Sequence, residues 1–475
     1  MCLVSGPMLA LLLLLLASQR ALCWRVPLPS AVLHGHARSS ARLRAKMARW
    51  GVTSPAAAGS RVFSPIDFGG DPTGAADSTA AVGAAATALL DACAPAARFA
   101  PVGRDCGGAT LDLSGGEFLI SAPLVFPASI ANFRVVQGTL RASPSFPRDR
   151  YLIEVGAPGG RGVVDVALSE LFLDASQVAA GCLLTNVVQG GVVGPQVYAF
   201  NFTQVGMSLN DGFELTVMQS WAGEFWYSDP RKENGTVSSA VGISKNSNDG
   251  DVIDVVVFSS NIGLVVNGEA NYIEAVHTWN LANAHGGVGI LVNRSQVRLA
   301  ANYLDWNDVV FTEPTRVTFS DGIFLCGARI RLVAPPSGVA DGISISANEF
   351  IGGYCHFSNY SAVEVDGAFS CALDVSVSGT LAEPGVRVRS PTATAVVASV
   401  TPTTLFTADF TAALLFDPAA VPITTVRVSL TADGGGVVAA VARPPVGGVV
   451  TVETAAPVVG SVVISVDQSA RREGA

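Results

Sequence analysis

A short phrase recurs along the middle of this chain: a glycine, an alternating apolar strand of three residues, and a small polar residue. It occurs four times, as Gly206–Asn210, Gly263–Asn267, Gly289–Asn293 and Gly342–Ser346. A second phrase recurs as His277–Asn280 and Leu304–Asn307. Gly263 and Gly289 are 26 residues apart, which is the length of one coil in a β-solenoid. Because one coil cannot bury its own apolar face, the pattern predicts stacked coils.

The surrounding sequence favours the same all-β fold. From Thr110 onward, short apolar runs are separated by Gly and Asn, with 49 Gly and 49% hydrophobic residues in 475. We find no period of about 40 residues typical of a propeller, and a sandwich would not give the coil phrase. Asparagines at the turns are expected to form hydrogen-bonded ladders between coils.

Two segments flank the predicted solenoid of residues 62–374. A helix from Ser78 to Cys93 is expected to cover the open end of the first coil. Residues 375–475 are rich in Val, Ala and Thr and predict a small antiparallel sandwich, with strands that include Val386–Arg389. This unit is expected to cover the last coil.

The N-terminus predicts export. Leu9–Ala17 has the length of a signal-peptide core, within a signal of residues 1–23. Residues 24–61 form an Arg- and Ser-rich leader, read either as a disordered pro-segment or as a second targeting signal. No later stretch predicts a transmembrane helix. Acceptor triplets for glycosylation begin at Asn201, Asn234, Asn293 and Asn359.

Six cysteines follow the signal region. Cys93 with Cys106, and Cys355 with Cys371, are close in sequence and are expected to close short loops. No cysteine or histidine spacing indicates zinc. Asp67, Asp71 and Asp77 resemble a calcium site, but turn and helix-cap roles are favoured, and we expect no cofactor.

The residues 62–81, VFSPIDFGGDPTGAADSTAA, resemble the opening signature of the pectate-lyase-like superfamily, which includes glycoside hydrolase family 28. Further segments between residues 138 and 317 are similar to the plant QUARTET-type polygalacturonases, and the resemblance covers about residues 62–468. It implies a right-handed single-stranded parallel β-helix and hydrolysis of α-1,4-galacturonan in the wall or extracellular matrix. The usual family 28 motifs are only echoed here, as at Arg329-Ile330-Arg331.

Hydrolysis of a glycosidic bond needs an acid for the leaving oxygen and a carboxylate that activates water or attacks the sugar. The candidates are Asp249, Asp254, His277 and Asp305, all mid-solenoid. Alignment of Asn261, Asn280 and Asn307 places Asp254 and His277 on one face and Asp305 one residue out of phase. For each candidate, the alternative interpretation is a structural role, either in a turn or in a hydrogen-bonded polar ladder.

Cations must bind the carboxylates of a uronate, and Lys245, Arg298, Arg316 and Arg329 are the candidates. The net charge of −9 argues against nucleic acid as a partner. We therefore expect a secreted, monomeric, polygalacturonase-like hydrolase that acts on an acidic polysaccharide. A calcium-dependent lyase and a non-catalytic carbohydrate-binding wall protein are the alternatives.

Overall fold

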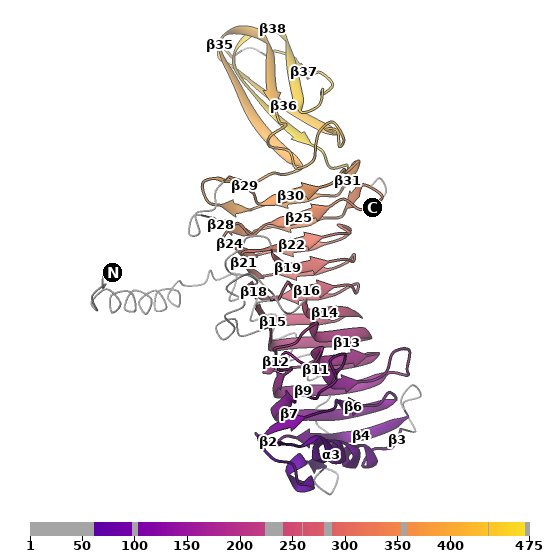
Figure 1. The fold of residues 1–475 in the computed structure, drawn as a ribbon. Helices are drawn as coiled ribbons and strands as arrows, with labels where there is room; N and C mark the ends of the chain where they lie inside the picture. Colours follow the sequence, from indigo (N-terminus) through magenta and orange to yellow (C-terminus); the bar gives the residue numbers. More distant parts are fainter. Residues whose placement is uncertain are drawn as a thin grey trace, which may run out of the picture. The chain divides into compact units, whose positions relative to one another are not determined.

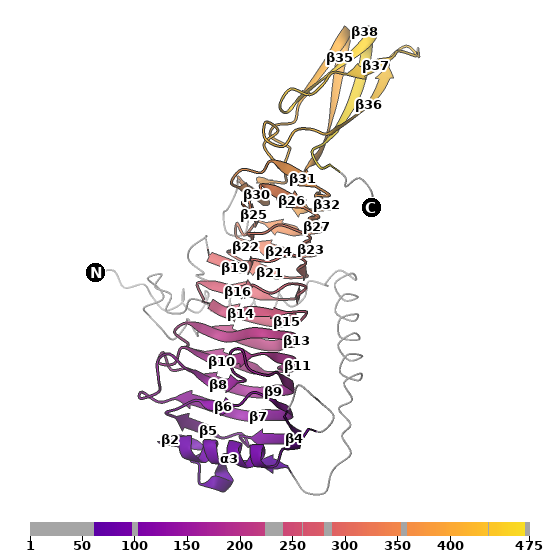
Figure 2. The same ribbon diagram turned by 90° about the vertical axis from the view of Figure 1, so that its right-hand side faces the viewer.

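The computed structural model describes residues 61–96, 103–223, 241–258, 260–279, 287–352, 359–435 and 437–470. Within them, 30 strands form one continuous hydrogen-bonded sheet that bends twice in each coil. Nearly all of its pairings are parallel, so the coils stack as a right-handed parallel β-helix (Figures 1 and 2). The predicted fold class is confirmed.

Each coil contributes to three sheets, which we call the first, second and third sheet. The first sheet contains β6 (Leu124–Phe126), β8 (Tyr151–Val155), β10 (Gly181–Asn186), the start of β13 (Val205–Gly223), β14 (Val241–Asn248), β16 (Ile262–Val266), β19 (Gly287–Val292), β22 (Asn307–Phe311), β25 (Ile330–Val333) and β30 (Val363–Asp366).

The second sheet follows the first in each coil. It contains β1 (Val62–Phe63), β4 (Arg104–Asp112), β7 (Ile130–Ala142), β9 (Val163–Asp174), β11 (Val188–Val193), the middle of β13, β15 (Asp251–Phe258), β17 (Tyr272–Glu274), β20 (Arg298–Ala300), β23 (Thr318–Ser320), β27 (Ser344–Ser346) and β32 (Ser376–Ser378).

The third sheet completes the coil. It contains β2 (Thr73–Asp77), β5 (Glu117–Ile120), the ends of β7, β9, β13 and β15, β12 (Val197–Phe200), β18 (His277–Trp279), β21 (Tyr303–Asp305), β24 (Ile323–Leu325), β28 (Glu349–Ile351) and β33 (Leu381–Ala382). A single residue with positive φ turns the chain from the second sheet into the third, for example Asp254, Ala275 and Ala301.

The interior is a set of apolar columns, because the same position of each coil points inward. In the first sheet one such column is fully buried and runs through Leu183, Met207, Ile243, Leu264, Ile290, Val309 and Ile330. Aromatic rings stack between coils in the same way. The ring centroids of Phe324 and Phe350, for example, are 4.4 Å apart. Stacking, and not any single coil, therefore supplies the core.

An asparagine ladder runs along the end of the first sheet, as expected. Asn246 donates to Asn210 at 2.6 Å, Asn267 to Asn246 at 2.6 Å, and Asn293 to Asn267 at 2.8 Å. Asn210, Asn267 and Asn293 each end one copy of the glycine-strand phrase. The fourth copy, Gly342–Ser346, lies instead in the second sheet.

Helix α3 (Thr79–Asp91) covers the first coil, as predicted. Val82, Ala85, Ala86 and Leu89 are buried in the same hydrophobic cluster as the coils. Asp77 Oδ1 accepts the backbone N–H of Thr79 at 2.8 Å at the start of the helix. The predicted disulfide Cys93–Cys106 forms and ties the end of α3 to β4. The short η1 (Pro65–Phe68) and β3 (Ala94–Pro95) complete this end.

The C-terminal region departs from the prediction in two ways. Parallel pairing continues past residue 374, because β32 and β33 stack on β27 and β28, and β34 (Val386–Arg387) pairs with β29 (Tyr360–Ser361). The run at Val386 therefore belongs to the β-helix, and so does β31 (Cys371–Leu373), which pairs with β26 (Val339–Asp341).

The second departure is that the sandwich is one bent antiparallel sheet. It contains β35 (Thr392–Asp409), β36 (Thr425–Ala432), β37 (Ala440–Ala442) and β38 (Val449–Asp467), with β38 at the centre. β35 and β38 are 18 and 19 residues long, and the core they enclose includes Val450 and Val452 from one half and Val462 and Ile464 from the other. Leu415 and Phe416 from this region join the core cluster of the β-helix and cover its end.

Candidate active site

The outward face of the third sheet carries two columns of residues, many of them aromatic. The first column runs through Phe172, Tyr198, Trp221, Val256, His277 and Tyr303. The second runs through Asp174, Phe200, Gly223, Phe258, Trp279 and Asp305. Neighbouring coils are about 4.8 Å apart, so residues 21 to 35 positions apart in sequence lie side by side.

His277 and Asp305 meet on this face. The Nε2 atom of His277 lies 3.3 Å from Oδ2 of Asp305, and their side chains are 31% and 18% exposed. His277 is paired in register with Tyr303, so Asp305 is its diagonal neighbour on the same face. The prediction that Asp305 is out of phase is wrong, because the strands repeat after 26 residues here and the asparagine alignment assumed 27. The pair is partly open to solvent.

Aromatic rings surround the His277–Asp305 pair. The His277 ring makes T-shaped contacts with the rings of Tyr303 and Phe258, at centroid distances of 4.5 and 5.7 Å. Phe258 in turn stacks on Trp221 at 4.9 Å and contacts Trp279 at 5.2 Å. Aromatic faces with one polar group suit the apolar faces of sugar rings.

Trp221 also offers an unused donor. Its indole Nε1 is buried and has no hydrogen-bond partner among the residues that the structure describes. A buried indole N–H usually finds an acceptor, and leaving it unpaired costs free energy. A bound sugar hydroxyl would satisfy it.

The other two carboxylate candidates do not join this pair directly. Asp254 is exposed at the turn between the second and third sheets, and its φ is 54°. Asp254 lies two coils before Asp305 and is displaced from it by four residues along the strand direction. This places the two Cα atoms roughly 16 Å apart. Asp249 is exposed at the turn that precedes β15, so it lies at the opposite end of the second-sheet strand. Two carboxylates that flank one glycosidic bond are no more than about 9.5 Å apart, so neither residue is a partner for Asp305.

A second polar cluster lies on the outward side of the first sheet. Arg329 Nη1 contacts Glu364 at 2.6 Å, and Arg331 is paired with Asp366. Both arginines also approach Asp308, at 3.8 and 3.9 Å. Of these, only Arg329 was predicted as a binding residue.

The cluster is internally paired, with two arginines facing three carboxylates. Arg329 also lies 5.6 Å from the ring of Tyr360, and burial raises the pKa of that phenol to about 12. The three acids of this cluster were not identified from the sequence, because they belong to the coils before and after the two arginines, in Asn307–Phe311 and Val363–Asp366. Stacking these two segments on the Arg-Ile-Arg phrase would have brought them together.

The remaining predicted cations are dispersed. Lys245 is fully buried inside the first sheet, where Nζ donates to Ser247 Oγ at 2.6 Å. It therefore does not bind a polymer on the surface, which corrects the prediction. Arg298 is exposed on the second sheet, and Arg316 is exposed at a turn with a φ of 52°. Neither lies on the third sheet.

The predicted modification sites have different surroundings. Asn201 donates to Asp174 at 2.9 Å, and Asn293 belongs to the asparagine ladder. Asn359 is exposed, and Asn234 lies outside the described residues. Glycosylation at these positions stays a prediction.

The second predicted disulfide is wrong. Cys371 carries a free thiol, as Cys182 does, whereas Cys326 is disulfide-bonded. Cys371 belongs to β31, where it pairs in register with Val339, so the β-helix fixes its position independently of a short loop. Cys355 lies outside the described residues.

The aspartates near the N-terminal end have structural roles. Asp71 accepts backbone N–H bonds from Thr73, Ala75 and Ala76, and these bonds with that of the Thr73 hydroxyl lower its pKa to about 2. Asp77 holds the start of α3. Within the described ranges, no group of three or more His, Cys, Asp or Glu side chains is placed to hold a metal ion.

Known proteins give one decisive match. The chain is 32% identical over 427 residues to Polygalacturonase QRT3 of Arabidopsis thaliana, covering 86% of this chain and 85% of that protein. The chain belongs to this polygalacturonase family. No family model matches it. The family assignment agrees with the resemblance drawn from the sequence.

Two solved structures of low sequence identity are also similar to this chain. The mannuronan C-5 epimerase AlgE4 A-module of Azotobacter vinelandii is 12% identical with a TM-score of 0.45, over 69% of this chain and 91% of that one. The Dettilon tailspike protein gp208 is also 12% identical with a TM-score of 0.45, over 86% and 94%. In the part of this chain that the structure describes, no helix has the length and apolar character needed to cross a membrane.

Proposed function

We propose that this protein hydrolyses an acidic polysaccharide of the pectin type, with the third-sheet face as its active site. The observation that carries the proposal is the 32% identity with a polygalacturonase over nearly the whole chain. The described residues add a partly exposed His277–Asp305 pair within an aromatic surface. This is the combination that sugar binding and proton transfer require.

In this proposal Asp305 is the carboxylate that exchanges a proton at the glycosidic bond. His277 orients it through the contact between Nε2 and Oδ2. Phe258, Trp279 and Tyr303 hold the sugar rings against the sheet. We also propose that the signal of residues 1–23 directs the protein to the cell exterior, where such a polymer is found.

The test measures reducing-end release and product size on a panel of pectins and polyuronates. Asp305→Asn should lower kcat/KM by about 10²-fold or more, because acid–base groups commonly contribute that much. Asp321→Asn is the matched control. Asp321 is an exposed carboxylate at the turn of the next coil, and Asn tolerates its φ of 57° as well as Asp does. Near-normal turnover by Asp305→Asn would place the reaction elsewhere.

A binding protein without catalysis is the second candidate, and one observation favours it. Among the described residues the only polar side-chain contact of Asp305 is with His277, whereas glycosidases use two carboxyl groups. Wild-type protein that binds oligogalacturonate but never shortens it would establish this reading. Loss of activity in a chelator, with unsaturated products, would instead establish the calcium-dependent lyase.

A further inference from the structure

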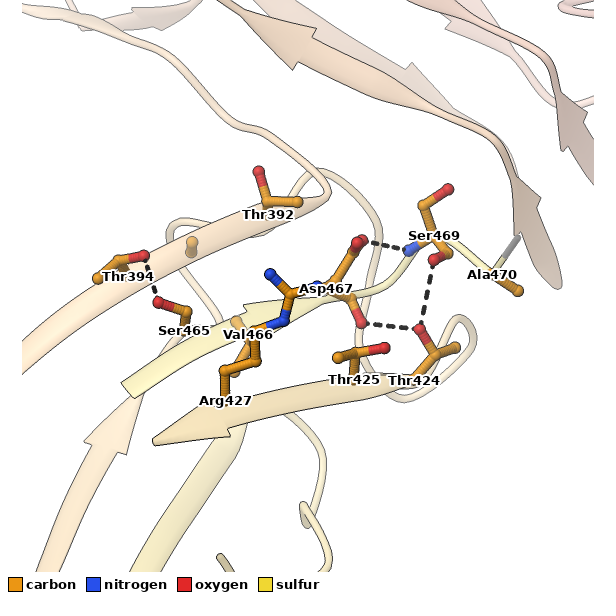
Figure 3. A pocket seen from close by; sticks show the side chains of 11 residues that line it. Thr392, Thr394, Thr424, Thr425, Arg427, Ser465, Val466, Asp467, Ser469 and Ala470 are labelled. Carbon is orange, nitrogen blue, oxygen red and sulfur yellow. Dashed lines mark hydrogen bonds between the residues drawn. The ribbon is translucent and has the colours of Figure 1, made fainter. Parts of the chain in front are cut away.

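A hollow of about 690 Å³ opens on the C-terminal sheet, far along the chain from the His277–Asp305 pair (Figure 3). Its lining is rich in hydroxyl groups, and most of it comes from the ends of β35, β36 and β38. The hydroxyl-bearing residues are Thr392, Thr394, Thr424, Thr425, Ser465 and Ser469. The size is typical of sites for small ligands.

Strand pairing fixes this surface. Ser465 is paired in register with Thr394 on one side and with Arg427 on the other. Asp467 is likewise paired with Thr392 and with Thr425. Residues two apart on a strand share a face, so these two rows stand side by side and point away from the sheet's apolar core. The site rests on regular strands and is preformed.

The hollow contains one cation and one anion that do not form an ion pair with each other. Arg427 is exposed, and no ion pair or hydrogen bond of its guanidinium is found with any described residue. Asp467 Oδ1 accepts the backbone N–H of Ser469 at 2.8 Å (Figure 3). In the same sheet Arg443 behaves differently, because it binds Glu453 at 2.9 Å.

A sugar acid matches this arrangement. Its carboxylate would accept from the guanidinium of Arg427, which suits planar carboxylates. Its ring hydroxyls would donate to Asp467 and exchange hydrogen bonds with the Thr and Ser hydroxyls. A simple inorganic anion would use Arg427 but would be repelled by Asp467.

We propose that this hollow is a second, non-catalytic binding site for a uronate unit of an acidic polysaccharide. The identity of the polymer rests on the proposed function, whereas the chemistry of the site does not. The site would hold the polymer near the enzyme and so lower the KM for long chains without changing kcat.

The experiment titrates short oligogalacturonates and, in parallel, neutral galacto-oligosaccharides into the full chain by calorimetry. Arg427→Gln should remove one binding site per chain for the acidic ligand, or weaken it at least tenfold. Arg443→Gln is the matched control and should bind as the wild type does. Both arginines are exposed, so neither change removes core packing. Unchanged binding by Arg427→Gln, or equal binding of the neutral sugar, would overturn the proposal.

Asp467→Asn separates a sugar from an adventitious anion. Loss of an acceptor for ring hydroxyls should weaken uronate binding, whereas an anion held by Arg427 alone should bind more tightly. Tighter binding of the uronate to Asp467→Asn would overturn the proposal. The proposed function is tested separately by product release, because binding at Arg427 requires no cleavage.

Discussion

The β-helix and the C-terminal sheet both pair strands that are distant in sequence, but they bring residues together differently. In the β-helix each strand pairs with the strand one coil away, as His277 does with Tyr303. In the C-terminal sheet the central strand β38 pairs with β35 so that Thr392 meets Asp467, 75 residues later in the sequence. A site on the β-helix is thus assembled from a repeat, whereas the Arg427 hollow depends on one central strand.

The largest expected effect is at the junction of the two regions. Phe416 is 2% exposed, and its ring lies 5.3 Å from that of Phe369 in the last part of the β-helix. Phe416→Ala should lower the free energy of unfolding by about 3–5 kcal/mol, because it opens a cavity over the last coil. Urea unfolding measures this.

The control for Phe416→Ala lies on the exposed surface of the C-terminal sheet. Val441 is 67% exposed, and Val441→Ala should change stability by no more than about 0.5 kcal/mol. If Phe416→Ala cost as little as Val441→Ala, the C-terminal region would not be covering the β-helix.

A smaller effect compares a polar ladder with a polar cross-strand pair. Asn267→Ala removes the ladder bonds to Asn246 and Asn293, which are 2.6 and 2.8 Å long. Thr451→Val removes one exposed bond to Thr407 in the C-terminal sheet, which is 3.1 Å long. We expect losses of about 1–2 kcal/mol for Asn267→Ala and less than about 1 kcal/mol for Thr451→Val.

The same unfolding assay measures both changes. A ladder residue has a neighbour on each side, so its removal takes one hydrogen bond from each of two amide groups. An equal loss of unfolding free energy for the two variants would show that a side chain in a repeated ladder stabilises the protein no more than one in a single cross-strand pair.

The smallest effect is a pH dependence of the N-terminal end. The pKa of Asp71 is lowered to about 2 by hydrogen bonds from Thr73, Ala75 and Ala76, and the pKa of Asp409 in the C-terminal sheet is lowered by bonds from Thr411. A carboxyl with a depressed pKa stabilises the folded state above its unfolded pKa of about 4, and that contribution is lost as the pH falls.

The difference in stability between wild type and Asp71→Asn should therefore be constant near neutral pH. It should shrink as the pH falls from about 4 through about 2, and Asp409→Asn should give a weaker trend of the same sign. Unfolding at several pH values and NMR titration of the carboxyl carbons are the measurements. A difference that grows on acidification would contradict the assigned hydrogen bonds.

The fold could be predicted because its cause is repeated in the sequence. Gly263–Asn267 and Gly289–Asn293 occupy equivalent positions, and each asparagine occurs where the ladder requires it. The C-terminal strands were recognised from alternation, but alternation does not show that β35 and β38 bend. One bent sheet and a two-sheet sandwich have the same apolar pattern.

The site could be predicted only in part, because register decides it. A shift of one residue moves a side chain to the other face of a sheet, and the turns of successive coils differ in length. His277 and Asp305 were identified as candidates, but their contact was not. Lys245 shows the same difficulty. It occupies an inward position of β14, but without the register a lysine is expected to be on the surface.

The cover formed by Leu415 and Phe416 has a consequence for how the protein is made. Both residues are synthesised after every coil they protect, and domains tend to fold as the chain emerges from the ribosome. The growing β-helix therefore carries an apolar end until the cover is translated. A premature stop codon before this segment would leave that end exposed. The cell would then have to remove a nearly complete β-helix that is prone to aggregate.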